Sequence, residues 1–206
     1  MRAAALLRRA ALAVLLLTAG APAFAGKILV WGDSLSAGYG LRPQEAWPDL
    51  LGQRLAGEKS AWTVVNGSIS GETTAGGRAH LPAALDRQRP AVVIIELGAN
   101  DGLRGLPVPA MVANLQAMID AARKAGAQVL LVGMRMPPNF GPDFTARYEK
   151  AFRDLARTNT LRFVPFLMDG FADQPAFFQP DGLHPVASAQ PRILETVWKE
   201  LKPLLH

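Results

Sequence analysis

Ile28-Leu29-Val30-Trp31-Gly32-Asp33-Ser34-Leu35-Ser36 is the stretch of sequence that decides the fold. Its first four residues form a short apolar run typical of a buried strand, and Gly32 provides a permissive backbone for a sharp turn. The polar residues that follow cannot continue such a strand. Open α/β sheets carry their chemistry where buried strands end in loops, so the stretch predicts a functional turn with Ser34 as a candidate nucleophile.

Two further segments favour the nucleophile interpretation. Alone, a Gly-Asp-Ser sequence is more often a turn whose side chain bonds its own backbone. However, Gly98-Ala99-Asn100-Asp101 also follows an apolar run, and Asp181-Gly182-Leu183-His184-Pro185 stands near the C-terminus. A serine nucleophile needs a base, and the base needs a carboxylate that fixes its tautomer. Asp181 and His184 are close enough in sequence for one short segment to present both on the same side.

Four sequence blocks, in this order, resemble those of the GDSL, or SGNH, hydrolase family. They are Gly32-Asp33-Ser34-Leu35, Ser70-Gly71-Glu72-Thr73, Gly98-Ala99-Asn100-Asp101 and Asp181-Gly182-Leu183-His184-Pro185. The resemblance runs from about Lys27 to the end of the chain. Longer strings, at 34–39, 64–71 and 100–105, are similar to the bacterial periplasmic branch that contains thioesterases, lysophospholipases and arylesterases.

Together these residues predict acyl transfer to water through a covalent acyl-serine. Ser34 attacks the carbonyl, His184 moves the proton, and Asp181 orients the imidazole. The candidate donors to the oxyanion are the backbone N–H groups of Ser34 and Gly71 and the side-chain amide of Asn100. The resemblance implies acyl esters and thioesters as substrates, namely aryl esters, fatty acyl thioesters and lysophospholipids. No cofactor is predicted.

The first 25 residues read as a secretory signal peptide. Three arginines precede an apolar run over 10–17, and Ala23-Phe24-Ala25 supplies a small-x-small cleavage site. The run is well below the ~20 residues that a bilayer span needs, so no stable membrane insertion is expected. The sequence therefore predicts cleavage after Ala25 and a periplasmic or secreted protein.

The remaining residues, 26–206, have the length of one domain. Three of the 22 Lys and Arg lie in the first 25 residues, so without that segment the formal net charge falls from +5 to +2. This balance gives no indication of nucleic-acid binding. The chain has no Cys, which removes thiol nucleophiles and thiolate metal ligands. Without sustained heptads, a monomer is expected.

Apolar runs alternate with amphipathic stretches along the whole domain, which is typical of repeated βα units and a parallel sheet. Strands are predicted at 28–31, 63–66, 92–97, 129–134 and 163–166. Helical stripes begin at Ala46, Val108, Phe144 and Ile193 and are expected to pack on the core. The predicted fold is a three-layer, flavodoxin-like α/β domain with strand order 2-1-3-4-5, which the resemblance also implies.

Apolar or glycine-rich loops beside the proposed site, at 103–107, 134–140 and 177–178, favour a groove for an acyl chain, although such loops also close cores. The resemblance places a flexible loop at about 101–107. Arg104 and Arg135 are candidates for contact with a phosphate or carboxylate on a substrate head group. The predicted substrate-binding residues are Leu103, Arg104, Leu106, Pro107, Pro138 and Phe140.

Other residues have structural explanations. His80 is expected to be a surface histidine, Asp33 and Asp101 to bond loop backbone, and Glu96 to be a buried, hydrogen-bonded carboxylate. The segment 67–71 lacks the serine of an α/β-hydrolase elbow, and neither a dinucleotide fingerprint nor a P-loop occurs. No metal site is predicted.

Three alternative functions stay open from sequence. A carbohydrate acetylesterase of the same family is the nearest alternative. A metal-dependent phosphoesterase could use Asp33, Asn100, Asp101, Asp181 and His184. A non-catalytic envelope protein could bind acyl chains in the same groove without turnover.

Overall fold

The computed structural model describes residues 26–205. The expected signal peptide, 1–25, therefore lies outside the described residues. Among residues 26–205, no helix is long and apolar enough to cross a membrane.

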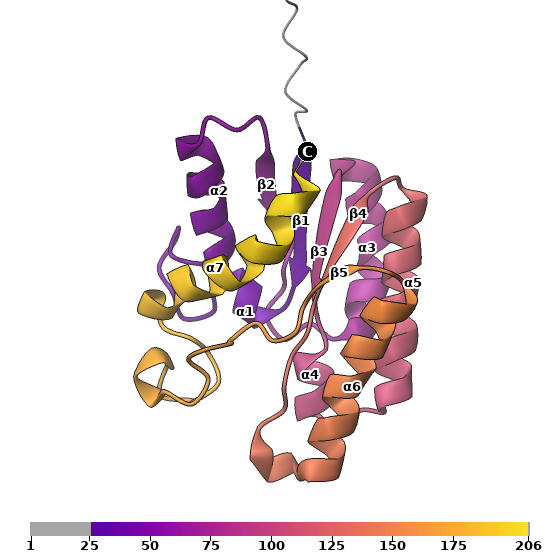
Figure 1. Cartoon of the computed structure of the whole chain (residues 1–206), viewed down its shortest axis with the longest axis vertical. Helices are drawn as coiled ribbons and strands as arrows, with labels where there is room; N and C mark the ends of the chain where they lie inside the picture. Colours follow the sequence, from indigo (N-terminus) through magenta and orange to yellow (C-terminus); the bar gives the residue numbers. More distant parts are fainter. Residues whose placement is uncertain (1–25, 206) are drawn as a thin grey trace, which may run out of the picture.

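A five-stranded parallel sheet forms the centre of the domain, in the order β2-β1-β3-β4-β5 (Figure 1). Its strands are β1 (Lys27–Gly32), β2 (Thr63–Asn66), β3 (Val92–Glu96), β4 (Gln128–Val132) and β5 (Arg162–Val164). The predicted fold class, strand order and strand positions are confirmed, with bounds that differ by one or two residues. All five strands run in the same direction, so their carboxyl ends share one edge of the sheet.

Helices cover both faces of this sheet, which gives three layers (Figure 1). On one side lie α2 (Trp47–Gly57) and α7 (Gln190–Leu201), which pack against each other. On the other side lie α3 (Thr74–Gln88), α5 (Val108–Lys124) and α6 (Pro142–Thr158), with α5 between the other two. The short helices α1 (Ser34–Ala37) and α4 (Ala99–Leu103) follow β1 and β3. Single 3₁₀ turns occur at η1 (Pro138–Phe140), η2 (Pro175–Phe177), η3 (Ala187–Ala189) and η4 (Lys202–Leu204).

The core follows from the residue types of the central strands and the helical stripes. Every residue of β3 is buried, as is every residue of β1 after Lys27, because helices cover both faces of these strands. The edge strand β2 is only partly buried. The helical stripes that face the sheet are buried as predicted, including Trp47 and Leu51 of α2 and the Tyr148-to-Leu155 stripe of α6. This packing fixes the strand ends on which the polar residues stand.

The predicted loops after β1 and β3 are wrong in one detail, because each contains a single turn of helix. Ser34 is the first residue of α1, and Asn100 is the second residue of α4. Asp33 caps α1, since its side chain accepts a hydrogen bond from Leu35 N. Helices this short have no amphipathic period that a sequence pattern could reveal. Their turns hold both side chains in fixed directions at the carboxyl edge of the sheet.

Candidate active site

The nucleophile candidate Ser34 stands where β1 ends at the carboxyl edge of the sheet. Its backbone is fixed by the α1 turn, in which Ala37 N donates to Asp33 O at 2.8 Å. The Ser34 side chain is only partly buried, whereas Asp33 and Ser36 on either side are fully buried. The turn therefore presents the Ser34 hydroxyl and buries its neighbours.

A continuous chain of hydrogen bonds joins Ser34 to the C-terminal segment. Ser34 Oγ lies 2.9 Å from His184 Nε2, and His184 Nδ1 lies 2.7 Å from Asp181 Oδ2. A carboxylate accepts hydrogen bonds, so the contact with Asp181 assigns the imidazole proton to Nδ1. Nε2 is then free to accept the serine proton. These are the relations that a nucleophile, its base and the orienting carboxylate require.

Asp181 is held by its own loop. Its Oδ1 accepts hydrogen bonds from His184 N at 3.0 Å and from Leu183 N at 2.9 Å. The backbone N–H of His184, followed by that of Leu183 and by the His184 side chain, lowers the pKa of Asp181 to about 2. An aspartate with this pKa stays ionised and available to stabilise a histidine cation.

The Tyr39 ring packs against the His184 ring, a contact that the sequence pattern did not predict. Its ring centroid lies 4.5 Å from that of His184, and its carbonyl accepts a hydrogen bond from Gln179 Nε2 at 2.7 Å. Tyr39 is one of the few large apolar side chains that are exposed. It belongs to the 34–39 string of the family resemblance, which was the one available signal.

The predicted oxyanion donors come from three separate segments. Gly71 adopts a φ of +79°, in the left-handed region that favours glycine, and its carbonyl accepts from Arg104 Nη2 at 3.0 Å. Asn100 Nδ2 donates to Asp33 Oδ2 at 3.1 Å and to Glu72 O at 3.0 Å. The serine, glycine and asparagine blocks are thus joined directly, and both N–H groups of the Asn100 amide have acceptors.

Two fully buried carboxylates lie beneath the nucleophile turn. Burial raises the pKa of Asp33 from its ordinary 3.8 to about 6. Burial, and next the negative charge of Asp33, raises the pKa of Glu96 well above its ordinary value. Glu96 Oε2 accepts a hydrogen bond from Ser36 Oγ at 2.6 Å. A Cβ on Gly32 would lie 2.6 Å from that carboxylate oxygen, so only glycine admits Glu96 at this position.

The expectations for these acids fit their contacts, with one exception. Asp33 bonds loop backbone through Leu35 N, and Glu96 is a buried, hydrogen-bonded carboxylate. Asp101, in contrast, does not hold its own loop with its side chain, because its carboxylate accepts from Thr74 N and Thr74 Oγ1 at the start of α3. His80 is exposed, as expected, and lies 3.2 Å from Glu72.

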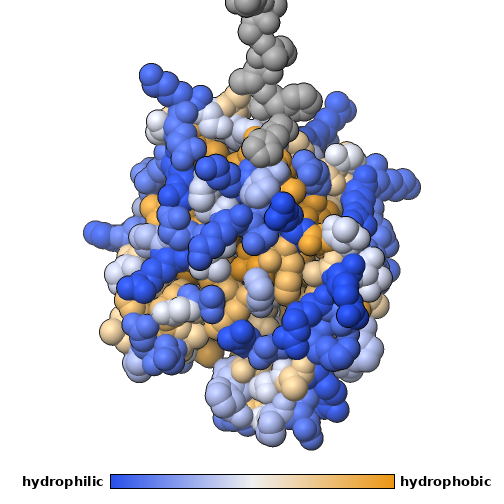
Figure 2. Space-filling model, in the orientation of Figure 1, coloured by the Kyte–Doolittle hydropathy of each residue, from blue (hydrophilic) through white to orange (hydrophobic). Residues whose placement is uncertain are grey.

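A cavity of about 920 Å³ opens beside Ser34, His184 and Asn100. Its apolar lining comes from the segments that follow β1, β3, β4 and β5. Figure 2 shows hydrophobic residues at the surface between the two helical layers. The apolar lining residues include Leu35, Leu103, Met134, Met136, Phe166, Met168 and Phe178.

Two of the six predicted substrate-binding residues, Leu103 and Pro138, line this cavity. The other four do not line it. Arg104 holds the Gly71 carbonyl, Leu106 is exposed, Pro107 caps α5, and Phe140 packs on Phe144 with ring centroids 6.0 Å apart.

The sequence reasoning named Phe178, which lines the cavity, but overlooked Phe166 and Met168 after β5 and the lining from α6. Phe166 and Met168 follow β5, and their position after a strand at the carboxyl edge could have indicated them. Thr145 and Glu149 come from α6, where only the core-facing stripe was recognisable.

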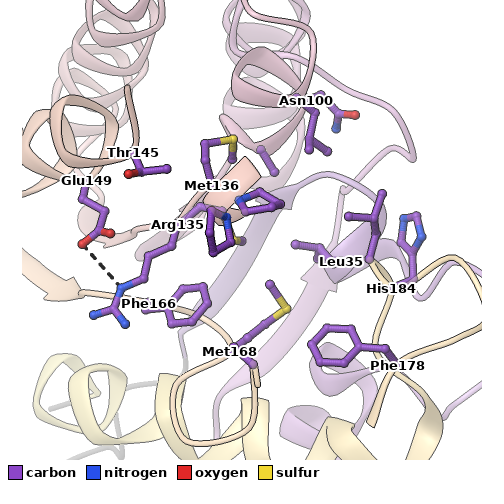
Figure 3. Close-up of a pocket in the computed structure, with 18 of the residues that line it drawn as sticks. Leu35, Asn100, Arg135, Met136, Thr145, Glu149, Phe166, Met168, Phe178 and His184 are labelled. Atoms are coloured by element: carbon purple, nitrogen blue, oxygen red, sulfur yellow. Dashed lines mark ion pairs between the residues drawn. The ribbon is translucent and has the colours of Figure 1, made fainter. Parts of the chain in front are cut away.

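An ion pair lies at the end of the cavity away from His184 (Figure 3). Arg135 Nε is 3.5 Å from Glu149 Oε2, and the Arg135 guanidinium lies 4.8 Å from the centroid of the Phe166 ring. The cavity is therefore apolar near the nucleophile and charged at its far end. Among residues 26–205, no group of three or more His, Cys, Asp or Glu is placed to hold a metal ion.

A family comparison agrees with this geometry. Residues 30–190 match the model of the GDSL-like lipase/acylhydrolase family. The chain belongs to this family. The match includes all four sequence blocks, so the resemblance seen in the sequence is confirmed, as are the α/β fold and the class of serine hydrolase.

Three curated relatives match nearly the whole chain. Esterase TesA of Pseudomonas aeruginosa is 47% identical over 201 residues, which cover 98% of this chain and 99% of that protein. Arylesterase of Vibrio mimicus is 43% identical over 175 residues, covering 85% and 88%. Thioesterase 1/protease 1/lysophospholipase L1 of Escherichia coli K12 is 38% identical over 184 residues, covering 89% and 87%.

A solved structure is similar over the same region. The psychrotrophic esterase EstA from Pseudoalteromonas sp., inhibited by monoethylphosphonate, superimposes with a TM-score of 0.83 at 38% identity. The match covers 87% of this chain and 98% of EstA.

Proposed function

We propose that this protein hydrolyses acyl esters and thioesters through an acyl-Ser34 intermediate. The observation that carries the proposal is the hydrogen-bonded chain from Asp181 through His184 to Ser34 at the mouth of an apolar cavity. In the first step, Ser34 Oγ attacks the carbonyl carbon while His184 Nε2 takes its proton and then protonates the leaving alcohol or thiol. In the second step, His184 takes a proton from the water that attacks the acyl-serine, and then returns this proton to Ser34 Oγ as the C–O bond breaks and the acid leaves.

Charge that develops on the carbonyl oxygen needs donors that are already in place. The backbone N–H groups of Ser34 and Gly71 and the amide of Asn100 are the proposed donors. Support comes from their placement, because Asn100 bonds Asp33 beside Ser34 and Glu72 beside Gly71. Asp181 remains ionised and stabilises the His184 cation through the 2.7 Å contact.

The proposed substrates are aryl esters, fatty acyl thioesters and lysophospholipids. The apolar cavity beside Ser34 has the size and lining expected of an acyl site. Relatives of this chain carry the names esterase, arylesterase and thioesterase/lysophospholipase. An acetyl group would fill only a small part of so large an apolar cavity. We therefore propose longer acyl chains as substrates over the acetylated carbohydrates of an acetylesterase.

We also propose that the protein is exported and acts in the periplasm or outside the cell as a monomer. The support for export is the sequence of residues 1–25, with its arginines, apolar run and Ala23-Phe24-Ala25 site. The domain is proposed to comprise residues 26–206.

The test is kcat/KM of the 26–206 chain on p-nitrophenyl esters from acetyl to palmitoyl, with Ser34→Ala as the control. Each methylene buried in the transition state is worth at most about 0.8 kcal/mol, or about fourfold, until the cavity is full. We expect a rise to medium or long chains that Ser34→Ala abolishes. A maximum at acetyl would favour the acetylesterase. Turnover that Ser34→Ala leaves intact would refute the nucleophile assignment.

A further inference from the structure

Asp33, directly before the proposed nucleophile Ser34, is a fully buried aspartate. Its carboxylate bonds both the serine turn and the segment that contains Asn100. Its Oδ1 accepts a hydrogen bond from Leu35 N at 3.0 Å, which caps α1. Its Oδ2 accepts from Asn100 Nδ2 at 3.1 Å, from a residue 67 positions away in sequence. One carboxylate therefore connects the serine turn to the asparagine that the proposed function makes an oxyanion donor.

The Asn100 amide has two N–H groups, and each already has an acceptor. One is the Asp33 carboxylate, and the other is the backbone carbonyl of Glu72 at 3.0 Å. An oxyanion in the site must share or replace one of these acceptors. Hydrogen bonds to an ionised acceptor are about twice as strong as those to a neutral one, so the bond to Asp33 is the one that persists. The N–H that faces Glu72 O is then the one available to the oxyanion.

We propose that Asp33 is a positioning residue that anchors the Asn100 amide and thereby directs its second N–H toward the oxyanion. This inference rests on the proposed function, since it assigns a role within the same reaction. A preorganised donor stabilises the transition state because it does not reorient as charge develops. Without the anchor, the amide is free to rotate and to keep its hydrogen bond to Glu72 O.

A carboxylate is the group that this position requires. The two bonds at Asp33 use two different oxygens, and a side-chain amide has only one oxygen acceptor. Asp33→Asn must therefore lose one bond or place two NH₂ groups against each other. Asp33→Ser keeps a residue that caps helices well, but its single short hydroxyl leaves Asn100 without an anchor. Both variants keep a polar side chain that can cap α1, so they test the loss of the bond to Asn100 without removing the whole side chain.

The deciding experiment is a double-mutant cycle on kcat at pH 8, with Asp33→Asn, Asn100→Ala and the double variant. Losing an oxyanion donor costs roughly 10²- to 10³-fold in kcat, and misdirecting it is expected to cost roughly 10- to 10²-fold, with KM changed less than about threefold. If Asp33 acts through Asn100, the double variant has nearly the kcat of Asn100→Ala. Asp33→Ser gives the same pattern if Asp33→Asn does not fold.

Additive losses would overturn the proposal. Asp33 also lies near His184, Glu96 and Asp101, and an effect through their charges would persist when Asn100 is replaced by alanine. Glu96→Gln is the matched control, because Glu96 is equally buried but its side chain bonds Ser36 and not Asn100. Its effect on kcat is expected to be the same in the wild type and in the Asn100→Ala variant. Circular dichroism spectra and thermal unfolding show whether each variant is folded.

The wild-type assay separates this proposal from the function on which it rests. Absence of any Ser34-dependent turnover would refute the proposed function and, with it, the role of Asp33. Ser34-dependent turnover with an additive cycle would refute the role of Asp33 alone.

Discussion

Asp33 and Asp181 lie on either side of the same Ser34–His184 pair, in opposite environments. Asp33 is fully buried, and burial raises its pKa to about 6. The Asp181 side chain is 38% exposed, and hydrogen bonds, first from the His184 N–H, lower its pKa to about 2. The Ser34–His184 pair is therefore flanked by two different acids. Asp181 ionises readily, whereas Asp33 ionises only at a cost in folding free energy.

The two aspartates also differ in where their partners come from. Within residues 26–205, the Asp181 carboxylate bonds Leu183 and His184 alone, so the four-residue segment 181–184 sets its geometry. Asp33 bonds Asn100, which depends on the packing of β1 beside β3. Damage to the Asp181 loop should therefore remain local, whereas a change at Asp33 should affect both the folded state and the site.

The largest expected effect comes from Asp181→Asn. An asparagine at this position can accept from the backbone but no longer favours the His184 tautomer with the proton on Nδ1, nor does it stabilise the imidazolium. We expect kcat to fall on the order of 10⁴-fold. Thermal stability at pH 7 should fall only modestly, because the Asp181 carboxylate favours the folded state but is partly exposed. Steady-state kinetics on a p-nitrophenyl ester measure this, with Asp86→Asn on the exposed face of α3 as the control. A loss below about tenfold would show that His184 does not depend on Asp181.

Replacing Asp33 by asparagine should also change the free energy of unfolding, and this change should depend on pH. The pKa of Asp33 is raised on folding whereas that of Asp181 is lowered, so the two pH dependences have opposite signs. The folded protein holds a proton on Asp33 up to about pH 6, while the unfolded chain releases it near 3.8. The folding free energy from this group is therefore fully present below about pH 4 and is lost as pH rises through 6. At about 1.4 kcal/mol per pKa unit, this amounts to about 3 kcal/mol.

Asp33→Asn has no such group, so its stability relative to the wild type should rise by about 3 kcal/mol between pH 4 and pH 7. Urea unfolding of both proteins across this range measures the difference. Asp181→Asn should show no such rise, since the wild-type Asp181 favours the folded state above pH 4. A pH-independent difference between Asp33→Asn and the wild type would mean that Asp33 is not protonated on folding.

Arg104 extends the comparison, because it is an exposed residue that bonds Gly71, the other proposed oxyanion donor from outside the serine turn. Its Nη2 donates to Gly71 O, as Asp33 accepts from Asn100, but the bond is in contact with solvent. We expect Arg104→Met to lower kcat by about three- to tenfold, because water competes for an exposed bond and the glycine turn is also fixed by its own backbone. Arg78→Met, on an exposed arginine of α3 that bonds Asn114, is the control. If Arg104→Met lowered kcat as much as Asp33→Asn, a buried anchor would contribute no more to kcat than an exposed one.

These contacts also show what a sequence can and cannot reveal. The strands and helical stripes were predictable because burial produces continuous apolar runs in covered strands, as in 92–97, and a helical period in amphipathic helices, as in the stripe from Val108. The proposed triad was predictable because Asp181 and His184 are neighbours in sequence and Ser34 follows a strand. The contacts of Asp33 with Asn100 and of Arg104 with Gly71 were not, since they depend on side-chain directions after two separate strands. The lining by Glu149 was hidden for the same reason, because its side chain meets Arg135, which comes from the separate segment after β4.

The smallest expected effect concerns Glu149, a third acid of the site, which is partly exposed like Asp181 but paired with arginines. It lies 3.5 Å from Arg135 and 3.3 Å from Arg153, at the end of the cavity away from His184. An acyl chain long enough to reach this end meets charge instead of apolar surface. Exposed ion pairs contribute roughly 0 to 1 kcal/mol, so the penalty on such a chain is modest.

Glu149→Leu should therefore raise the ratio of kcat/KM for p-nitrophenyl palmitate to that for the acetate by about two- to fourfold, within the limit of about one buried methylene. The matched control is Glu195→Leu, which breaks the exposed Arg54–Glu195 pair between α2 and α7, away from the cavity. An unchanged ratio, or an equal rise in the control, would mean that the acyl chain does not reach Arg135. A rise confined to Glu149→Leu would show that this partly exposed acid acts on the choice of substrate, in contrast to the roles in the reaction that are proposed for Asp33 and Asp181.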